Sequence, residues 1–333
     1  MKTKPLKYPA TYGIRDEFDA LYSADGSKLL KYDNDDLKTY SIREGTKVIC
    51  DNVFLLCLNF KLQEVIIPDS VEYIGDSALS FSGSLRRVVI PKSIKHISSN
   101  PFVSCRNLTL ESKSSRFIID HGMLIDTKHQ KLICYNGQAE EVAIPDGVKI
   151  IGNYSFAYNE TIKKVVVPNT VVKIGNSAFK YCKALEQINI PNSVIGIGNN
   201  AFNSCLSLRQ IHIPNSVKSI GACAFEDCFY MQQILIPDSV VRIGDVAFQC
   251  CKHLQQITIS NPTTILGEDV FGSENTVFWY EDFDDENDDP EYDMECDGLC
   301  DRLQQIFIPE GSEEHFKQML SKEYWDKLTN IKK

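Results

Sequence analysis

The sequence predicts an α/β-type repeat solenoid that is mostly β, and three observations support this fold class. First, prolines recur every 23 residues, at Pro145, Pro168, Pro191, Pro214 and Pro237. Second, each proline lies in a copy of one phrase, seen as LEQINIPNSVIGIGNNAFNSC at 185–205 and LRQIHIPNSVKSIGACAFEDC at 208–228. Third, apolar residues alternate at period two before each proline. A fixed period of this length is the signature of stacked supersecondary units, so we expect a single elongated domain over 1–333.

Each coil of the predicted solenoid begins with a β-strand. Leu208, Ile211 and Ile213 illustrate the alternation that indicates a strand with one buried face. Proline ends the strand because it cannot donate to a ladder. The stretch 216–220 then returns the chain along the other side. The glycine that follows, Gly221 in this copy, predicts either a positive φ or a very close approach of two backbones.

Two columns of side chains fill the predicted interior. The Ala-Phe pair of each phrase predicts a continuous spine of stacked rings, formed by Phe156, Phe179, Phe202, Phe225, Phe248 and Phe271. The cysteine of each phrase predicts a second column, formed by Cys57, Cys105, Cys182, Cys205, Cys228, Cys251 and Cys300. A free cysteine behaves as a small buried hydrophobe. We therefore expect reduced core thiols, which fits a reducing compartment.

Departures from the 23-residue period mark the remaining elements. The segments ALYSADGSKLLKY and FIIDHGMLIDTKHQKLICY each place apolar runs on both sides of a polar turn, which predicts two β-hairpins. Ser312 is expected to cap a helix over roughly 313–328, which would cover the end of the solenoid. The predicted organisation is an N-terminal hairpin cap (18–36), first coils (37–114), a hairpin insertion (115–140), regular coils (141–280), an acidic loop (281–300), and a last strand with the capping helix (301–333).

The phrase IPxSVxxIGxxAFxxC, the DHGMLIDTKHQKLICY hairpin and the IPEGSEEHFKQML ending together resemble the BspA-like leucine-rich repeat proteins. The resemblance covers roughly residues 18–331. It implies a curved, right-handed leucine-rich repeat solenoid with a parallel sheet on one face. Members of this family are often bacterial surface or secreted proteins that adhere to host proteins or to other cells, so the resemblance also implies a bacterial, adhesin-like protein.

The predicted strands leave two columns of side chains pointing outward, and these are the candidate binding residues. The face of a parallel sheet normally needs cover, so apolar residues on an open one favour a protein or peptide partner. The candidates are Val89, Val166, Gln187, Asn189, Gln210, His212, Gln233, Leu235, Gln256, Thr258, Gln305 and Phe307. The alternative for the glutamines is a structural amide ladder between neighbouring strands.

The acidic charge of the chain is concentrated in one block. The net charge is −10, and residues 281–297 hold 11 acidic side chains and no Lys or Arg, so the rest of the chain carries −10 + 11 = +1. Such a block is typical of a solvated loop, with contact to a basic partner as the next interpretation. No basic stripe appears, which argues against a nucleic-acid partner.

The sequence favours a non-enzymatic protein-interaction module with no cofactor and no metal. No phosphate loop or nucleophile elbow is present, and the six histidines lack paired-ligand spacing. Carboxylates in the acidic block could hold calcium, and Cys296 and Cys300 lack the second pair that a zinc site needs. A metal or enzymatic site around 281–300 therefore remains the less favoured alternative.

The expected location of the protein is the cytoplasm, with no insertion into a membrane. The N-terminal residues contain no apolar core of a secretory signal. The longest uninterrupted apolar run, Val53–Leu58, is much shorter than a membrane span. The alternative is a cell-surface or secreted adhesin that binds a host protein or glycan, with a leader that this sequence does not include.

Overall fold

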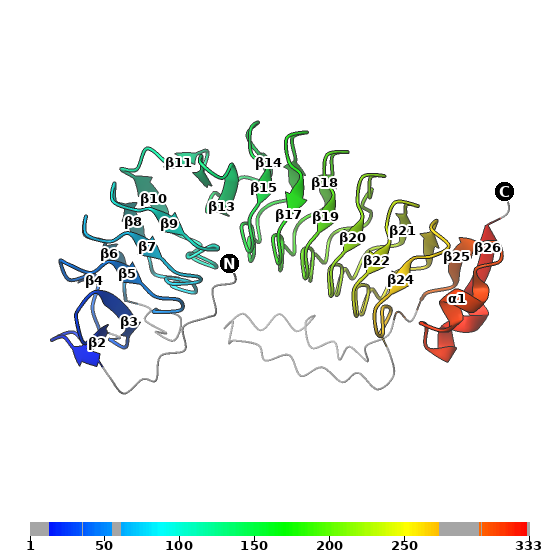
Figure 1. The fold of residues 1–333 in the computed structure, drawn as a ribbon, viewed down its shortest axis with the longest axis horizontal. Coiled ribbons are helices and arrows are strands. Elements are labelled where there is room, and N and C mark those ends of the chain that lie inside the picture. Colours follow the sequence, from blue (N-terminus) through cyan, green and yellow to red (C-terminus); the bar gives the residue numbers. More distant parts are fainter. Residues whose placement is uncertain (1–12, 35, 55–60, 273–299, 301, 332–333) are drawn as a thin grey trace. The chain divides into compact units, whose positions relative to one another are not determined.

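The computed structural model describes residues 13–34, 36–54, 61–272, 300 and 302–331. Two compact units, Met1–Gly137 and Gln138–Lys333, make up the chain and are described in turn as unit 1 and unit 2. Each is a mostly-β solenoid whose coils stack through parallel strands (Figure 1). The predicted acidic loop (281–300) lies outside the described residues, except for Cys300. The single domain over 1–333 stays a prediction.

Unit 1 contains two stacks of parallel strands with antiparallel strands at its beginning and its end. One sheet runs through β1 (Gly13–Arg15), β2 (Ala20–Ser23), β3 (Lys28–Tyr32), β5 (Val48–Ile49), β7 (Tyr73–Ile74) and β9 (His96–Ile97). The other contains β4 (Thr39–Ser41), β6 (Glu64–Ile66), β8 (Arg87–Ile90) and β10 (Thr109–Ser112). The unit ends with the antiparallel strands β11 (Phe117–Asp120), β12 (Met123–Asp126) and β13 (Lys131–Tyr135).

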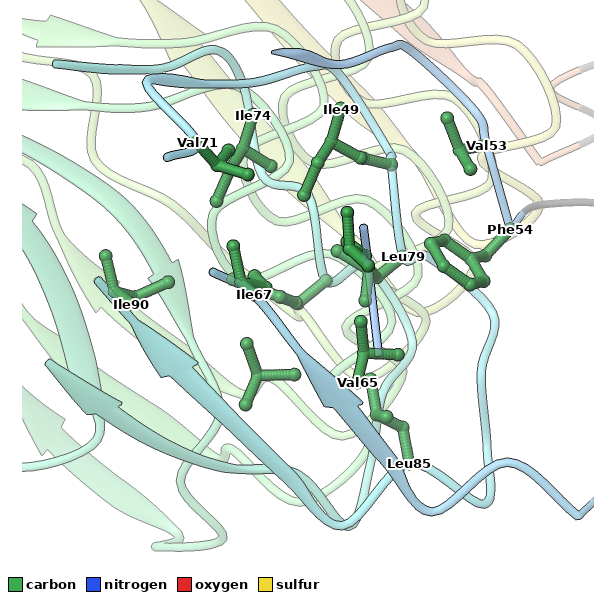
Figure 2. Packing of buried hydrophobic residues seen from close by; sticks show 14 of the residues in the cluster. Ile49, Val53, Phe54, Val65, Ile67, Val71, Ile74, Leu79, Leu85 and Ile90 are labelled. Atoms are coloured by element: carbon green, nitrogen blue, oxygen red, sulfur yellow. The ribbon is translucent and has the colours of Figure 1, made fainter. Parts of the chain in front are cut away.

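Both predicted hairpins are present, and each has one additional strand. Strands β2 and β3 pair as the first hairpin and β12 and β13 as the second, while β1 and β11 add antiparallel partners. Between the parallel stacks, buried side chains such as Ile49 and Ile74 from one and Val65 from the other form a continuous core (Figure 2). Burial of these apolar surfaces is the main favourable term that stacks the coils.

A buried carboxylate fixes the turn of the second hairpin. Asp126, which is almost fully buried, accepts hydrogen bonds from Arg116 Nε at 2.9 Å and Arg116 Nη2 at 2.7 Å. Its Oδ2 also lies 2.7 Å from His129 Nδ1. Burial raises the pKa of Asp126, but the hydrogen bonds from Arg116 and His129 outweigh it and hold the pKa below its ordinary value. These hydrogen bonds therefore hold the turn of the second hairpin in place, and we call Asp126, Arg116 and His129 together the hairpin lock.

Unit 2 contains the regular coils and again has two strand stacks. The first stack comprises β14 (Glu141–Ala143), β16 (Lys164–Val166), β18 (Gln187–Asn189), β21 (Gln233–Ile236), β23 (Gln256–Ile259), β25 (Gln305–Pro309) and β26 (Leu328–Ile331). The second stack comprises β15 (Ile150–Ile151), β17 (Lys173–Ile174), β19 (Gly196–Ile197), β20 (Ser219–Ile220), β22 (Arg242–Ile243) and β24 (Ile265–Leu266). All neighbouring strands that pair within these stacks are parallel, and the steps follow the 23-residue period as far as β23 and β24. The last two steps of the first stack differ, because Gln256 pairs with Gln305 and Ile306 pairs with Leu328.

The phenylalanine spine is confirmed in unit 2. Successive rings from Phe156 to Phe271 have centroids 4.8, 5.3, 5.4, 5.5 and 6.1 Å apart. The four steps up to Phe248 are within 10° of parallel. Each of these rings is almost fully buried. Such stacking adds to the stabilisation from apolar burial.

The predicted cysteine column is also confirmed for its described members. Cys182, Cys205 and Cys228 are buried free thiols, and each donates through Sγ to the phenylalanine carbonyl of the preceding coil at 3.1–3.2 Å. Burial raises the pKa of Cys182 to about 12, which makes the thiol a poor nucleophile. The expectation of reduced cysteines fails at Cys250, outside the column, which is disulfide-bonded. Cys57 lies outside the described residues.

The recurring glycine is required by close approach and not by a positive φ. A Cβ added to Gly221 would lie 2.4 Å from the backbone nitrogen of Asn199, and one added to Gly198 would lie 2.6 Å from the carbonyl carbon of Gly175. Beside this contact, the side-chain Oδ1 of Asn199 accepts a hydrogen bond from the N–H of Ala222 at 3.0 Å. Glycine lets each coil approach its neighbour closely enough for this bond.

The predicted capping helix is too long. The structure has a five-residue helix α1 (Glu313–Lys317), a 3₁₀ helix η1 (Lys322–Lys327) and then β26, which pairs with β25. Ser312 makes no side-chain capping bond, and its Oγ donates instead to Pro309 O at 2.5 Å. Tyr324 is buried in η1, where its ring packs against Phe271, the last ring of the spine, and its hydroxyl donates to Phe271 O at 2.9 Å. The chain turns after α1 to make these contacts.

Candidate binding face

The outward side of the first stack in unit 2, with the turns that lead into its strands, forms the candidate binding face. Alternation along β16 and β21 buries Val165 and Ile234 and turns the residues beside them outward. Val166 is 45% exposed and Leu235 is 50% exposed, which is unusual for large apolar side chains in strands. Their register places the outward residues of neighbouring coils in rows across the face.

All twelve candidate residues lie at outward positions of their coils, with different degrees of exposure. The exposed members are Val166, Gln187, Asn189, Gln210, His212, Gln233, Leu235 and Gln256. The half-buried members are Val89, Thr258, Gln305 and Phe307. Leu235, Thr258 and Phe307 are aligned on adjacent strands, so they form one continuous row. Val89 belongs to unit 1.

The glutamines form an amide ladder at only one step within the described residues. Gln256 Nε2 donates to Gln305 Oε1 at 3.4 Å. Gln187, Gln210 and Gln233 make no hydrogen bond to a neighbouring glutamine in this part of the chain. Their amides are exposed and each offers a donor and an acceptor.

Asn189 has a structural role that the sequence did not indicate. Its Oδ1 accepts from Val167 N at 3.0 Å, and its Nδ2 donates to Val167 O at 3.1 Å. The amide therefore satisfies backbone groups of the neighbouring coil at the end of β16. Among the candidates, Asn189 is the one whose polar atoms are already engaged with the backbone.

The parallel ladder of the first stack is interrupted at His212. No strand is formed at 210–212, so the stack consists of a three-stranded sheet ending at β18 and a four-stranded sheet beginning at β21. Ile211 still points inward and is buried. His212 is thus an exposed side chain on a coil that lies between two sheets, at the centre of the candidate face.

An aromatic cluster that sequence reasoning missed borders the same face. Tyr230 lies in the turn that leads into β21, and His253 holds the same turn position one coil later. Their ring centroids are 5.2 Å apart, and Phe229 packs against both rings. The guanidinium carbon of Arg209 lies 5.8 Å from the Tyr230 ring, in cation–π range. The 23-residue spacing between Tyr230 and His253 could have indicated this cluster from the sequence, because it places the two rings at the same position of consecutive coils.

The corresponding face of unit 1 differs in chemistry. Arg87 binds Glu64 at 2.7 Å and Glu111 at 2.9 Å, so a charged network crosses three adjacent strands. Val89 lies beside this network on the same strand as Arg87. Exposed ion pairs of this kind contribute little to stability, but they leave fewer apolar and neutral groups for a partner than the face of unit 2 has.

The described residues contain no cluster that could hold a metal ion. No group of three or more His, Cys, Asp or Glu side chains gathers where it could hold a metal ion within the described ranges. In the same part of the chain, no helix has the length and apolar character of a membrane span. The face is suited to non-covalent contact through apolar, aromatic and amide groups.

Comparison with known proteins agrees with this architecture. A model of the BspA type leucine-rich repeat region matches residues 30–128, 127–200 and 172–278, in six copies. No curated protein sequence matches significantly.

Solved structures with the same fold include three bacterial proteins. A leucine-rich cell surface protein from Faecalibacterium prausnitzii is 31% identical over 67% of this chain, with a TM-score of 0.61; this chain spans 60% of that protein. The pneumococcal vaccine antigen PcpA is 21% identical, with 95% of this chain and 80% of that one covered and a TM-score of 0.60. A leucine-rich repeat protein from Bacteroides ovatus is 21% identical, with 89% and 67% covered and a TM-score of 0.52. On the family model and the repeat architecture, the chain belongs to the BspA-type leucine-rich repeat family.

Proposed function

We propose that unit 2 is a non-enzymatic protein-interaction module that binds a protein or peptide partner on the outward face of its first stack. The observation that carries the proposal is the exposure of Val166 and Leu235 on parallel sheets whose outward side has no cover among the described residues. Burying such side chains against a partner removes apolar surface from water, at roughly 25 cal/mol per Å².

The polar groups of the face support specificity. Gln210 and Gln233 offer unshared amides beside Leu235, and Tyr230 offers an exposed ring backed by Arg209. Aromatic residues and arginine are enriched among the side chains that dominate binding energies at protein interfaces. A row that combines these groups with a central apolar side chain matches the usual anatomy of such an interface.

The cell surface is the proposed setting for this binding, as an adhesin-like protein. The F. prausnitzii relative, at 31% identity, is described as a cell surface protein. The disulfide of Cys250 also fits an oxidising compartment better than the cytoplasm. The rival setting, a cytoplasmic scaffold, was favoured by the free thiols of the cysteine column. Treating intact cells with protease separates the two, because only a surface protein is cleaved before lysis.

The binding test uses a variant with two charged side chains on the face. Val166→Asp together with Leu235→Asp changes only exposed positions, so the fold should be retained. The protein is used to capture partners from host-cell surface extracts, and each captured protein is then measured against purified variants. The double variant should lose binding of that partner, whereas Ile118→Asp, at an exposed position of β11 in unit 1, should retain it. Equal binding by the double variant would remove the first-stack face from consideration.

A further inference from the structure

The second stack of unit 2 carries an outward column of exposed apolar side chains that has no role in the proposed function. The column is the position directly after the buried valine of each coil, with Thr264 replacing that valine in the last coil. Its apolar members are Val172, Ile195, Val241 and Ile265, which are 38, 59, 52 and 51% exposed. Backbone hydrogen bonds join consecutive members, as from Ile195 N to Val172 O at 3.0 Å and from Ile265 N to Val241 O at 3.0 Å. The column is therefore a fixed surface feature.

Basic side chains occupy positions within and beside this column. They are Lys149, Lys173, Lys218 and Arg242, and all four are exposed. None of them forms an ion pair within the described residues, and no acidic residue occupies an outward position of the six strands. We name the four apolar and four basic residues together the second-stack strip. It presents a net charge of +4 among exposed hydrophobic groups.

Unit 1 shows what the same coil position looks like when an acid lies between its cations. There the position is occupied by Lys47, Glu72 and Lys95 on consecutive coils. A Glu72 carboxylate oxygen lies 2.6 Å from Lys95 Nζ and another lies 3.6 Å from Lys47 Nζ, so both lysines already have an ion-pair partner within the protein. Unit 2 has the same backbone and lacks that acid, which leaves its cations available to an external carboxylate.

We propose that the second-stack strip binds an extended, acidic peptide segment in which Asp or Glu alternates with apolar residues. The strip crosses six parallel strands, or five spacings of about 4.8 Å, for a length of about 24 Å. An extended segment rises about 3.3 Å per residue, so about seven residues match this length. Alternation places carboxylates beside the lysines and apolar side chains over Ile195 and Val241. The first-stack proposal is independent, because that face lies on other strands.

Exposed carboxylates next to the strip favour a peptide over an anionic membrane. Asp146 and Asp238 precede the strip residues of their coils along the chain, and Asp245 and Glu268 follow them. A flat anionic bilayer that contacts the strip would also approach these four acids and be repelled by them. A peptide only a few ångströms wide can follow the strip and avoid them.

The test measures binding of a fluorescein-labelled seven-residue peptide in which glutamate alternates with leucine, by fluorescence anisotropy with the full chain. A matched peptide with glutamine in place of glutamate is the probe control, because a neutral peptide is not attracted to the acidic block at 281–297. Lys149→Glu with Lys218→Glu reverses two charges of the strip, at positions that directly follow the buried valine of their coils. Lys47→Glu with Lys95→Glu makes the same change at the equivalent coil position of unit 1 and is the variant control. Circular dichroism verifies that both variants are folded.

The wild-type chain should bind the acidic peptide and not the neutral one, and the affinity should fall as salt is added. Reversing two strip charges should weaken binding roughly tenfold or more, since each exposed pair changes from attraction to repulsion. The unit 1 control should change it by less than about twofold. The proposal is overturned if both peptides bind equally, if the strip variant binds normally, or if phosphatidylserine vesicles displace the acidic peptide and bind in its place.

Discussion

Replacement of Phe202 by alanine tests the energetic role of the phenylalanine spine. Phe202 is completely buried, and its ring lies 5.3 Å from that of Phe179 and 5.4 Å from that of Phe225, within 4° of parallel to each. Removing a buried phenylalanine typically costs about 3–5 kcal/mol through lost burial and the cavity that remains. Because Phe202 has a stacked ring on each side, we expect its replacement to cost about 4 kcal/mol, near the middle of that range.

The assay is guanidinium chloride unfolding followed by circular dichroism, with the free energy of unfolding compared between variants. Tyr230→Ala is the control, because this aromatic side chain is 44% exposed, and we expect it to cost about 1 kcal/mol. A loss below about 1.5 kcal/mol for Phe202→Ala, or a loss equal to that of the control, would refute the spine as a main source of cohesion between coils.

Three further changes test other parts of the structure. Burial and the charge of Asp227 raise the pKa of Glu226 to about 6 from 4.5, so ionisation of this carboxyl opposes folding as the pH rises through 6. Glu226→Gln should therefore stabilise the protein by up to about 2 kcal/mol at pH 8 and hardly at pH 4. Equal effects on the free energy of unfolding at both pH values would contradict this. On successive coils the side-chain Oδ1 atoms of Asn153, Asn176 and Asn199 each accept a hydrogen bond from a backbone N–H of the next coil, and Ala222 interrupts this row of acceptors. Ala222→Asn should therefore supply an acceptor for the N–H of Asp245 and raise the free energy of unfolding by about 0.5–1 kcal/mol. A decrease would show that the row does not stabilise the fold. Asp126→Asn should cost about 2 kcal/mol at pH 7, since it removes the charged partner of a partly buried guanidinium, and a neutral result in thermal unfolding would show that the second hairpin does not depend on this lock.

The repeat period made most of the interior predictable. One 23-residue phrase fixes which residues are buried, so Phe202, Cys205 and Ile211 could each be placed from their positions in the phrase. The same regularity explains the serine of the phrase, since Ser216 Oγ donates to Val194 O of the preceding coil at 2.7 Å. A residue that recurs because its contact recurs is readily predicted from sequence.

Features that depend on backbone conformation or on several coils together were not predictable. Tyr181, Ser204 and Val246 adopt positive φ values of 58°, 56° and 48° without being glycine, and residue type gives no indication of this. The engagement of Asn189 with Val167 depends on the separation of two coils.

The binding surfaces were predicted only in part for the same reason. Outward positions of the first stack follow from period-two alternation, whereas the second stack forms two-residue strands, too short for alternation to be recognised. Ile195 was therefore not expected to be exposed. Strand β26 was not predicted either, because it is held by pairing with β25 and no local sequence pattern indicates it.

Site-specific photo-crosslinking on intact cells tests the central claim most directly. A photoreactive amino acid is placed at position 235, or at position 195, in the full chain, and adducts are identified by mass spectrometry after irradiation. The account predicts a protein adduct at Leu235 that is absent at Ile195, because the first-stack face of unit 2 contacts the partner. The same adduct from both positions, or none from Leu235 while a partner is bound, would contradict it.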